Sequence, residues 1–178
     1  MNEARSGALF RRMDARELAL CLAINRVCRR PSLARGFAVV SRLGDGVLWY
    51  VLTAALPLIY GPHGMAAAVH MAAAGLLGVT VYKSLKGNMT RQRPFVTHAD
   101  IRRGTAPLDR YSFPSGHTLH AVAFTLVVLA YCPALFWLVV PFAVLVALSR
   151  VVLGLHYPSD VLAGAAVGAV LAGIVLRF

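Results

Sequence analysis

Long apolar runs, separated by short breaks rich in glycine and proline, constrain the fold of this chain more than any other feature. A helix that crosses a membrane needs about 20 predominantly apolar residues. Backbone amides inside a bilayer must be hydrogen-bonded within the protein, which favours helices over open strands. We therefore expect an all-α integral membrane helical bundle of about five transmembrane helices. The expected spans lie within residues 36–60, 65–82, 117–132, 134–153 and 160–176.

The composition supports a membrane protein and narrows the choice of partners. Of the 178 residues, 58% are hydrophobic, and 18 basic residues against 7 acidic residues give a formal net charge of +11. Because this positive charge lies beside apolar spans, anionic lipid headgroups are better partners than nucleic acid. No nucleic-acid-binding motif is recognisable in the sequence. We expect contact with membrane lipids and no binding of nucleic acid.

The residues before the first span differ from the rest of the chain. Residues 1–16 carry four arginines, which predicts a flexible basic arm without a secretory signal. Residues 17–30 predict an amphipathic helix that is too short to cross a bilayer. This helix would lie in the membrane interface or pack on the bundle. We therefore divide a single domain into an arm with an interfacial helix (1–32) and a transmembrane bundle (33–178).

A few polar and small residues inside the spans have ordinary structural explanations. We expect Asp45 to play a structural role and His70 to hydrogen-bond to a neighbouring helix. Gly164 and Gly168 form a pattern of small residues suited to helix contact, either within the subunit or across a homodimer, and we prefer the former. The three cysteines are an odd number without a Cys-x-x-Cys pattern, so neither a disulfide framework nor a zinc site is predicted.

Three short polar segments interrupt the apolar sequence, at residues 86–94, 114–117 and 149–160. Ionisable groups at a membrane boundary are costly, so they are candidates for function. Arginine binds phosphate through a planar fork of donors, and lysine adds a compact charge. The segments therefore contain a coherent set for handling phosphate. It consists of three cations, two histidines and one carboxylate: Lys86, Arg93, Arg150, His117, His156 and Asp160.

The second and third segments have the features of helix N-termini. Ser115 lies where the N-cap of the following apolar helix belongs, and Gly116 would let a ligand approach the backbone N–H groups. His117 then lies in the first turn, close enough to pass a proton to a ligand. Pro158 fits a first helical position, which places Asp160 in the first turn of the last helix and close to His156. A carboxylate beside an imidazole orients it and stabilises its cationic form.

Together the segments read Lys-x6-Arg-Pro, Pro-Ser-Gly-His and Ser-Arg-x5-His-x3-Asp. This pattern resembles the type 2 phosphatidic acid phosphatase (PAP2) superfamily, which includes vanadium haloperoxidases and bacterial acid phosphatases. The resemblance covers residues 83–164, and every signature position matches in order. A single His-x3-Asp would carry no weight, whereas three correctly spaced segments are specific.

The resemblance implies a role for each signature residue. His156 is the expected nucleophile that forms a phosphohistidine, Asp160 orients it, and His117 protonates the leaving oxygen. The phosphate oxygens would be held by Lys86, Arg93, Ser115, Gly116 and Arg150. No metal and no cofactor are implied, because the cations stabilise the charge that Mg²⁺ stabilises in other phosphoryl transfers.

The function expected from this resemblance is that of a membrane-embedded, metal-independent lipid phosphatase. The candidate substrates are phosphatidic acid, phosphatidylglycerophosphate, and a polyprenyl phosphate or diphosphate. The alternatives are a phosphatase for a small soluble phosphate ester, and a membrane protein that binds or transports lipid without turnover. The intact nucleophile, orienting carboxylate and acid favour an enzyme, since binding alone would need only the cations.

The distribution of basic residues predicts the orientation in the cell inner membrane. With five spans, the N-terminus and the loops that contain the signature residues share one face, and that face has most of the arginines. The positive-inside rule then places the site on the cytoplasmic side. Bacterial members of the superfamily mostly resemble enzymes with the site on the outer face, which conflicts with this count. Three further arginines in the polar loop belong either to a second anion or lipid contact or to a solvated loop: Arg102, Arg103 and Arg110.

Overall fold

The computed structural model describes residues 2–178, apart from the side chains of residues 2–12 and 88. Over these residues the chain is helical and contains no strand. In order, the elements are α1 (Asn2–Asn25), η1 (Arg26–Arg29), α2 (Pro31–Arg42), η2 (Leu43–Val47), α3 (Leu48–Asn88), α4 (Pro94–Thr97), α5 (Gly116–Tyr131), η3 (Pro133–Leu135), α6 (Phe136–Val152) and α7 (Pro158–Val175).

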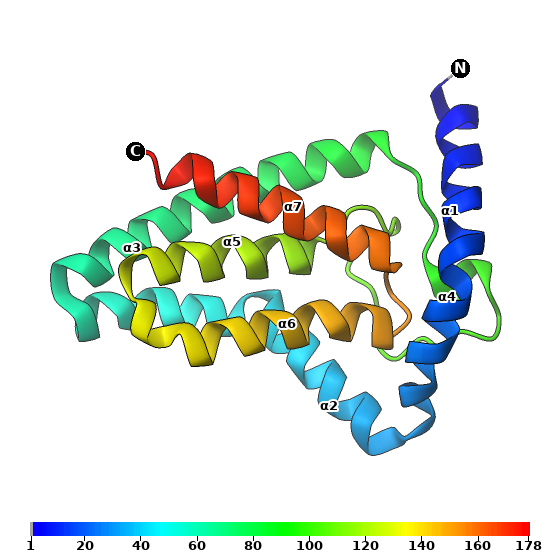
Figure 1. Cartoon of the computed structure of the whole chain (residues 1–178), viewed down its shortest axis with the longest axis horizontal. Helices are drawn as coiled ribbons and strands as arrows, with labels where there is room; N and C mark the ends of the chain where they lie inside the picture. Colours follow the sequence, from blue (N-terminus) through cyan, green and yellow to red (C-terminus); the bar gives the residue numbers. More distant parts are fainter. Residues whose placement is uncertain (1) are drawn as a thin grey trace.

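Helix α3 is a hairpin of two apolar arms and not one straight rod (Figure 1). The chain reverses at Gly61, whose φ of 56° suits glycine better than any other residue. Next to the turn, a Cβ on Gly64 would lie 1.9 Å from the carbonyl oxygen of Leu56, so the two arms approach more closely than a larger residue allows. The turn expected between the first two spans is therefore present at residues 61–64.

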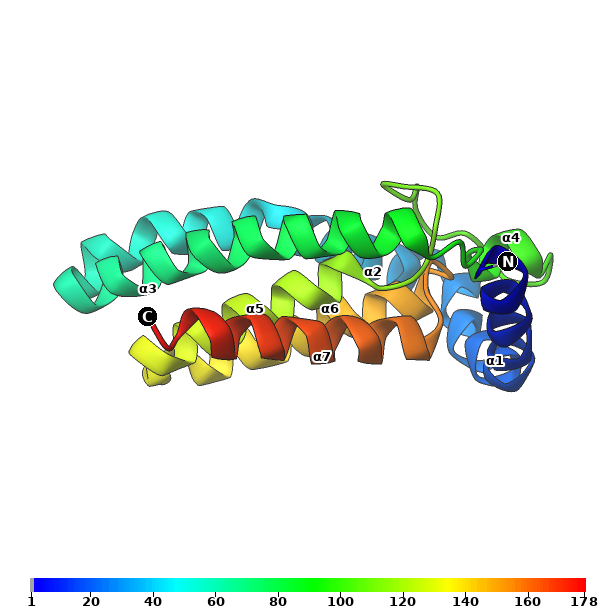
Figure 2. The ribbon, with the colours of Figure 1, turned by 90° about the horizontal axis from the view of Figure 1, so that it is seen from above.

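The two arms of α3 run alongside α5, α6 and α7 and form an elongated bundle (Figures 1 and 2). Three stretches of the described chain are long and apolar enough to cross a membrane, at Pro31–Gly87, Pro133–Val152 and Pro158–Val175, and α5 is a shorter apolar helix. Trp49, Met71 and Val127 lie in the core, whereas Leu58 and Trp137 are more than 80% exposed. Large apolar side chains on the outside are expected where lipid is the solvent. The predicted all-α membrane bundle is confirmed.

The range expected to hold the first span, 36–60, contains the end of α2, the turn η2 and the first arm of α3. Helix α2 ends at Arg42, and the wide turn η2 separates it from α3, with Gly46 at a φ of 139°. Helix α2 leaves the bundle at an angle (Figure 1). The break occurs because glycine on both sides of Asp45 permits the unusual backbone, and because Gly44 packs where a Cβ would lie 2.5 Å from the Val146 side chain.

The flexible arm expected at the N-terminus is wrong for residues 2–16, which are helical; residue 1 lies outside the described residues. Alanine and arginine are good helix formers, and they are frequent in this segment. Helix α1 crosses the end of the bundle (Figure 1). Its buried Cys21 belongs to a cluster with Ile101 and Tyr157, so much of its apolar face packs on protein and not on lipid.

Two smaller expectations are met within the bundle. A Cβ on Gly164 would lie 2.5 Å from the carbonyl oxygen of Ser115, and one on Gly168 would lie 2.3 Å from that of Leu119. These glycines therefore allow α7 to pack closely on α5 in the same subunit. His70 lies 3.2 Å from the hydroxyl of Tyr131, which is the expected bond to a neighbouring helix.

Candidate active site

The three polar segments meet at the end of the bundle that α1 crosses. Lys86 is near the end of α3, Arg93 directly precedes α4, and Arg150 is near the end of α6. His156 lies in the turn between α6 and α7, and His117 is in the first turn of α5. Of the eight signature residues with an expected role, six are less than 10% exposed: Lys86, Arg93, Ser115, Arg150, His156 and Asp160. Residues separated by up to 74 positions thus form one buried polar cluster.

His156 is held between a cation and a carboxylate. Its Nε2 lies 3.3 Å from Nη1 of Arg93, and its Nδ1 lies 3.6 Å from Oδ2 of Asp160. The backbone N–H of His156 donates to the carbonyl of Arg150. The ring therefore directs one nitrogen toward the cations and the other toward the carboxylate. Asp160 is thus close enough to orient His156, although Nδ1 makes no hydrogen bond among the described residues, while Nε2 faces Arg93.

The environment of His156 keeps the imidazole neutral. Burial lowers the pKa of His156 well below its usual value, and the positive charges of Arg150 and Arg93 lower it further. His156 lies in the turn between two helices, outside the apolar spans. A neutral imidazole has a lone pair on one nitrogen, and a nucleophile needs that lone pair.

Arg91 braces Asp160, and sequence reasoning assigned it no role. Nη1 of Arg91 donates to Oδ1 of Asp160 at 2.5 Å, and its Nε donates to Asp14 of α1 at 2.9 Å. The guanidinium also lies 4.1 Å from the ring centroid of Tyr157. Oδ2 of Asp160 accepts from the backbone N–H of Tyr157, which completes a capping box at the start of α7. Asp160 is thus fixed from both sides. No sequence signal links Arg91 to Asp14, because the pair depends on how α1 crosses the bundle.

Asp109 is a second residue that sequence reasoning missed. Its carboxylate accepts hydrogen bonds from Lys86, from the hydroxyl of Tyr82, and from Nη2 of Arg93 at 2.8 Å. Burial raises the pKa of Asp109, but the hydrogen bonds from Lys86 and Tyr82 and the nearby positive charges outweigh it, so the pKa falls below its usual value. The carboxylate of Asp109 is therefore bound to Lys86 and Arg93, two of the cations that are expected to hold phosphate.

Arg150 belongs to the same cluster and has an N–H donor that no described residue accepts. Its Nη1 donates to the hydroxyl of Ser41, whereas its buried Nε has no hydrogen-bond partner among the described residues. A small hollow of about 30 Å³ is lined by Ser41, Asp45, His117 and Arg150. A buried arginine N–H without a partner is costly, so an anion or water in this hollow would stabilise it.

The start of α5 differs from the expectation in one detail. Ser115 is the N-cap residue, but its side chain makes no capping bond to the backbone. Its hydroxyl lies instead 3.0 Å from that of Thr118, one turn later, because this second hydroxyl offers a side-chain partner at the same place. A Cβ on Gly116 would lie 2.6 Å from the Tyr82 ring, so packing alone already requires glycine there.

Asp45 contacts His117, although we expected only a structural role for this carboxylate. Oδ1 of Asp45 lies 3.4 Å from Nε2 of His117. The break between α2 and α3 brings Asp45 to this position. The outlying arginines contact other side chains: Arg103 lies over the ring of Phe95 and Arg110 over that of Tyr111. Both interpretations of these exposed arginines stay predictions.

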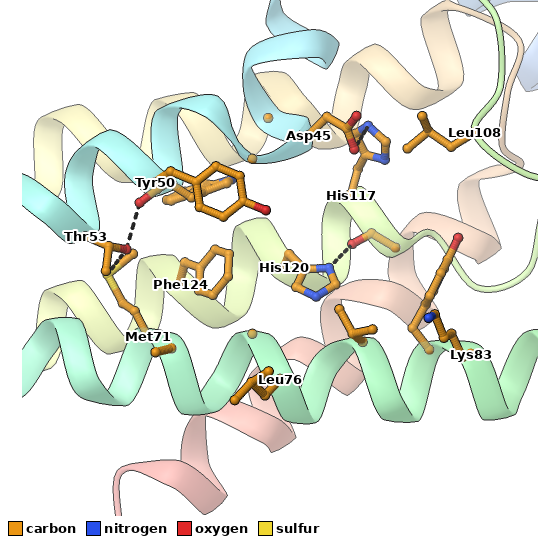
Figure 3. Close-up of a pocket in the computed structure, with 18 residues that line it drawn as sticks. Asp45, Tyr50, Thr53, Met71, Leu76, Lys83, Leu108, His117, His120 and Phe124 are labelled. Carbon is orange, nitrogen blue, oxygen red and sulfur yellow. Dashed lines mark hydrogen bonds and ion pairs between the residues drawn. The ribbon is translucent and has the colours of Figure 1, made fainter.

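Beside His117, a cavity of about 650 Å³ opens between the two arms of α3 and helix α5 (Figure 3). Trp49, Met71, Leu76 and Phe124 give it an apolar end, while Asp45, His117 and His120 lie toward its polar end. Among the residues whose side chains are described, no group of three or more His, Cys, Asp or Glu residues could hold a metal ion. The expectation of a metal-independent site stays a prediction.

Comparison with known proteins agrees with the motifs. Residues 63–178 match the PAP2 superfamily. The chain is 33% identical over 137 residues to a decaprenylphosphoryl-5-phosphoribose phosphatase of Mycolicibacterium smegmatis, covering 76% of this chain and 73% of that protein. It is 32% identical over 104 residues to the undecaprenyl-diphosphatase BcrC of Bacillus subtilis, covering 58% of this chain and 53% of that protein.

Two solved structures share the fold. Aquifex aeolicus LpxE superposes with a TM-score of 0.73 at 25% identity, covering 91% of this chain and 95% of that one. A PAP2-type phosphatidylglycerolphosphate phosphatase from Bacillus subtilis superposes with a TM-score of 0.63 at 22% identity, covering 99% and 95%. The motifs, the match over 63–178 and the shared membrane fold together show that this chain belongs to the PAP2 superfamily and is a membrane-embedded phosphatase.

Proposed function

We propose that this phosphatase hydrolyses a lipid phosphate, without a metal ion, through a phosphohistidine on His156. One observation carries the proposal. Nε2 of His156 faces Arg93, with Asp160 behind the ring, while the cations Lys86 and Arg93 already hold the carboxylate of Asp109 where a phosphate is expected. A phosphate that displaces Asp109 would meet these cations and lie in front of the nucleophile.

Each step of the proposed reaction has a residue in place. Nε2 of His156 attacks phosphorus, the bond from phosphorus to the alcohol oxygen breaks, and His117 gives its proton to that oxygen. Water then attacks the phosphohistidine, the P–N bond breaks, and His117 takes the proton of the water. Lys86, Arg93 and Arg150 stabilise the charge on the equatorial oxygens. Ser115 and Gly116 supply backbone and hydroxyl donors at the start of α5.

We further propose that the lipid has a polyprenyl chain. Relatives that act on decaprenyl and undecaprenyl compounds support this choice, and so does the cavity beside His117, whose apolar end lies between helices of the bundle. A long hydrocarbon chain could enter there while the phosphate stays at the polar end. We place the protein in the cell inner membrane, as expected from the sequence.

The same charge distribution supports a cytoplasmic active site. Arg26, Arg29 and Arg30 are exposed near the end that α1 crosses, and Arg102 and Arg103 are exposed in the polar loop. The C-terminus, with Arg177, lies at the opposite end of the bundle (Figure 1). The positive-inside rule places the richer end in the cytoplasm. A reporter fused after Phe178 that is active only outside the cytoplasm would support this orientation, and one active only inside would overturn it.

The proposed activity is tested by phosphate release from the purified protein in mild detergent. The panel contains phosphatidic acid, phosphatidylglycerophosphate, a polyprenyl phosphate and a polyprenyl diphosphate, each with EDTA and with the His156→Ala variant alongside. Release that survives EDTA and disappears in the variant supports the proposal. Release that EDTA abolishes overturns metal independence, and activity on sugar phosphates alone would replace the lipid substrate by a small soluble ester.

A further inference from the structure

The carboxylate of Asp109 lies on the cations of the site and close to the nucleophile. Its Oδ1 accepts from Nζ of Lys86 and, at 2.8 Å, from Nη2 of Arg93, while its Oδ2 accepts from the hydroxyl of Tyr82. The other Nη of the same guanidinium lies 3.3 Å from Nε2 of His156. A carboxylate and a phosphate accept hydrogen bonds from the same cationic donors, so Asp109 and a bound phosphate compete for them.

The segment that carries Asp109, residues 105–111, is tied to the bundle mainly through the same two cations. Among the described residues, its backbone makes no hydrogen bond to other backbone groups. Instead, Nε of Arg93 donates to the carbonyl of Asp109 at 3.1 Å, and Nζ of Lys86 donates to the carbonyl of Tyr111 at 2.7 Å. A ligand that takes these two side chains therefore also releases the segment.

The 105–111 segment lies between two anchored positions. The backbone N–H groups of Gly104 and Ser112 both donate to carbonyls of other segments. Between them, the side chain of Asp109 is 30% exposed and Leu108 is 61% exposed. Figure 2 shows part of the connection between α4 and α5 standing out from the bundle. A segment with few backbone hydrogen bonds and much exposed surface opens locally at low cost, and water can receive the Asp109 carboxylate.

The same segment borders the space in which a phosphate is expected. Three of its residues line the small hollow beside Arg150 and His117: Thr105, Ala106 and Leu108. The hollow has a volume of about 30 Å³, roughly the share of one water molecule in the liquid, so a phosphate does not fit. Displacement of Asp109 with its segment would free the cations and widen this hollow at the same time.

We propose that Asp109 is an internal competitor for the phosphate site, carried by a lid of residues 105–111 that opens when a phosphate binds. This proposal rests on the proposed function in one respect, that Lys86 and Arg93 bind phosphate. A phosphate dianion displaces Asp109 because it has more charge and more acceptor oxygens than a carboxylate. After hydrolysis, Asp109 returns to the cations and displaces inorganic phosphate. The competitor thus weakens phosphate binding and speeds product release.

The first test measures the binding of inorganic phosphate by isothermal titration calorimetry in mild detergent, which needs no turnover. Asp109→Asn keeps the shape of the side chain but removes the competing charge. It should lower the Kd of phosphate about 10-fold or more, because the apparent affinity is reduced by the fraction of molecules in which the cations are free.

The matched control for Asp109→Asn is Asp45→Asn. Asp45 is a carboxylate of similar exposure, 32% against 30%, and it lies 3.4 Å from His117. Among the described residues it forms no ion pair with Lys86 or Arg93. Asp45→Asn therefore removes a nearby negative charge without freeing the cations, and it should change the Kd of phosphate by less than about threefold.

The second test follows the lid in the wild-type protein by limited digestion with trypsin. Arg110 is exposed within the lid, whereas Arg102 is exposed before it and its backbone is held on both sides by Asn25. Saturating phosphate should speed cleavage after Arg110 about threefold or more, because cleavage follows the population of the open segment. Cleavage after Arg102 should stay as it is in chloride of the same ionic strength.

The outcomes separate the competitor from the proposed function. Tighter binding only in Asp109→Asn, with faster cleavage after Arg110, supports the proposal, even if no lipid is hydrolysed and the proposed function fails. No gain in Asp109→Asn, or an equal gain in Asp45→Asn, overturns the competition while the phosphatase activity stands. Unchanged or slower cleavage after Arg110 overturns the lid, and it decides this without a variant if Asp109→Asn does not fold. Absence of phosphate binding in every protein overturns both proposals.

Discussion

The two histidines of the site lie in contrasting surroundings. His156 is buried and enclosed by Arg93, Asp160 and the backbone of Arg150, and Asp160 is itself braced by Arg91. His117 lies between a small hollow and a large cavity, and its charged neighbour Asp45 is partly exposed. One histidine is therefore fixed by a dense network, and the other borders open space.

This contrast fits the two parts of a substrate. His156 attacks the phosphate, which all substrates share, whereas His117 contacts the leaving group, which differs among them. The transferred phosphate is the same in every phosphate ester, so the groups that bind it can be rigid and enclosed. The leaving group differs from one lipid to another, so the space beside the acid has to admit it. We therefore expect changes near His156 to affect all substrates alike, and changes near His117 to affect them unequally.

The largest effect is expected for His156→Ala, which removes the nucleophile. Turnover should fall by at least ~10³-fold for every substrate. Phosphate release is the measurement, and His63→Ala is the control, because His63 is exposed at the far turn of α3. Substantial residual activity in His156→Ala would contradict the nucleophilic role.

The next effect is expected for His117→Ala and should depend on the leaving group. Removal of a general acid typically costs 10²–10⁴-fold, roughly, when the leaving alcohol is a poor one. An activated aryl phosphate such as p-nitrophenyl phosphate needs little protonation and should lose much less. Equal losses on the lipid and the aryl substrate would argue against an acid role for His117.

Arg91→Met should disturb the network around His156 without removing a catalytic group. Loss of one partner of a buried ion pair costs about 3–5 kcal/mol, because it leaves the other charge uncompensated. We expect a lower midpoint of thermal unfolding and a kcat that falls about tenfold or more, since Asp160 orients His156 less well, with a smaller change in KM.

Asp14→Asn is the matched comparison for Arg91→Met. It weakens the contact of Arg91 with α1 but leaves the contact of Arg91 with Asp160 in place. Its kcat should stay closer to that of the wild type. If both variants lower kcat equally, α1 and not the Arg91–Asp160 pair controls the nucleophile.

Gly168→Ala tests the close contact between α5 and α7, the two helices that begin next to His117 and His156. The added Cβ would meet a backbone oxygen, so the helices must separate, which costs about 1–3 kcal/mol. Gly173→Ala on the same helix is the control, because a Cβ there meets nothing within 4 Å. Equal unfolding midpoints for the two variants would contradict the contact.

The smallest effect concerns stability in acid. Burial lowers the pKa of His156 in the folded protein, whereas the unfolded chain takes up a proton near pH 6.5. The unfolded state therefore binds more protons below that pH, and the folded state loses stability as the pH falls. His156→Asn should remove a loss of roughly 1–2 kcal/mol between pH 7.5 and 5. An identical pH dependence in both proteins would contradict a neutral His156.

Much of the fold was predictable because its signals are local. Apolar runs and proline or glycine breaks predicted helices ending near Cys132, Leu153 and Leu176, and the structure ends them within one residue of these positions. Gly44, Asp45 and Gly46 mark the break inside 36–60 in the sequence. The angle at which α2 leaves the bundle depends on packing, with Gly44 against Val146, and the sequence does not reveal it. The helical N-terminus is not evident from the sequence, because four arginines and few apolar residues favour a flexible arm.

The sequence alone determined the residues of the signature and the helices that hold them, because both depend on short spacings along the chain. Only the tertiary structure decided that Asp109 binds Lys86 and Arg93. It also decided that Arg91 joins Asp160 to α1, and that Asp45 lies beside His117. These contacts join segments as far apart as residues 14 and 91. Their geometry follows from how the helices pack, and the order of residues along the chain does not reveal it.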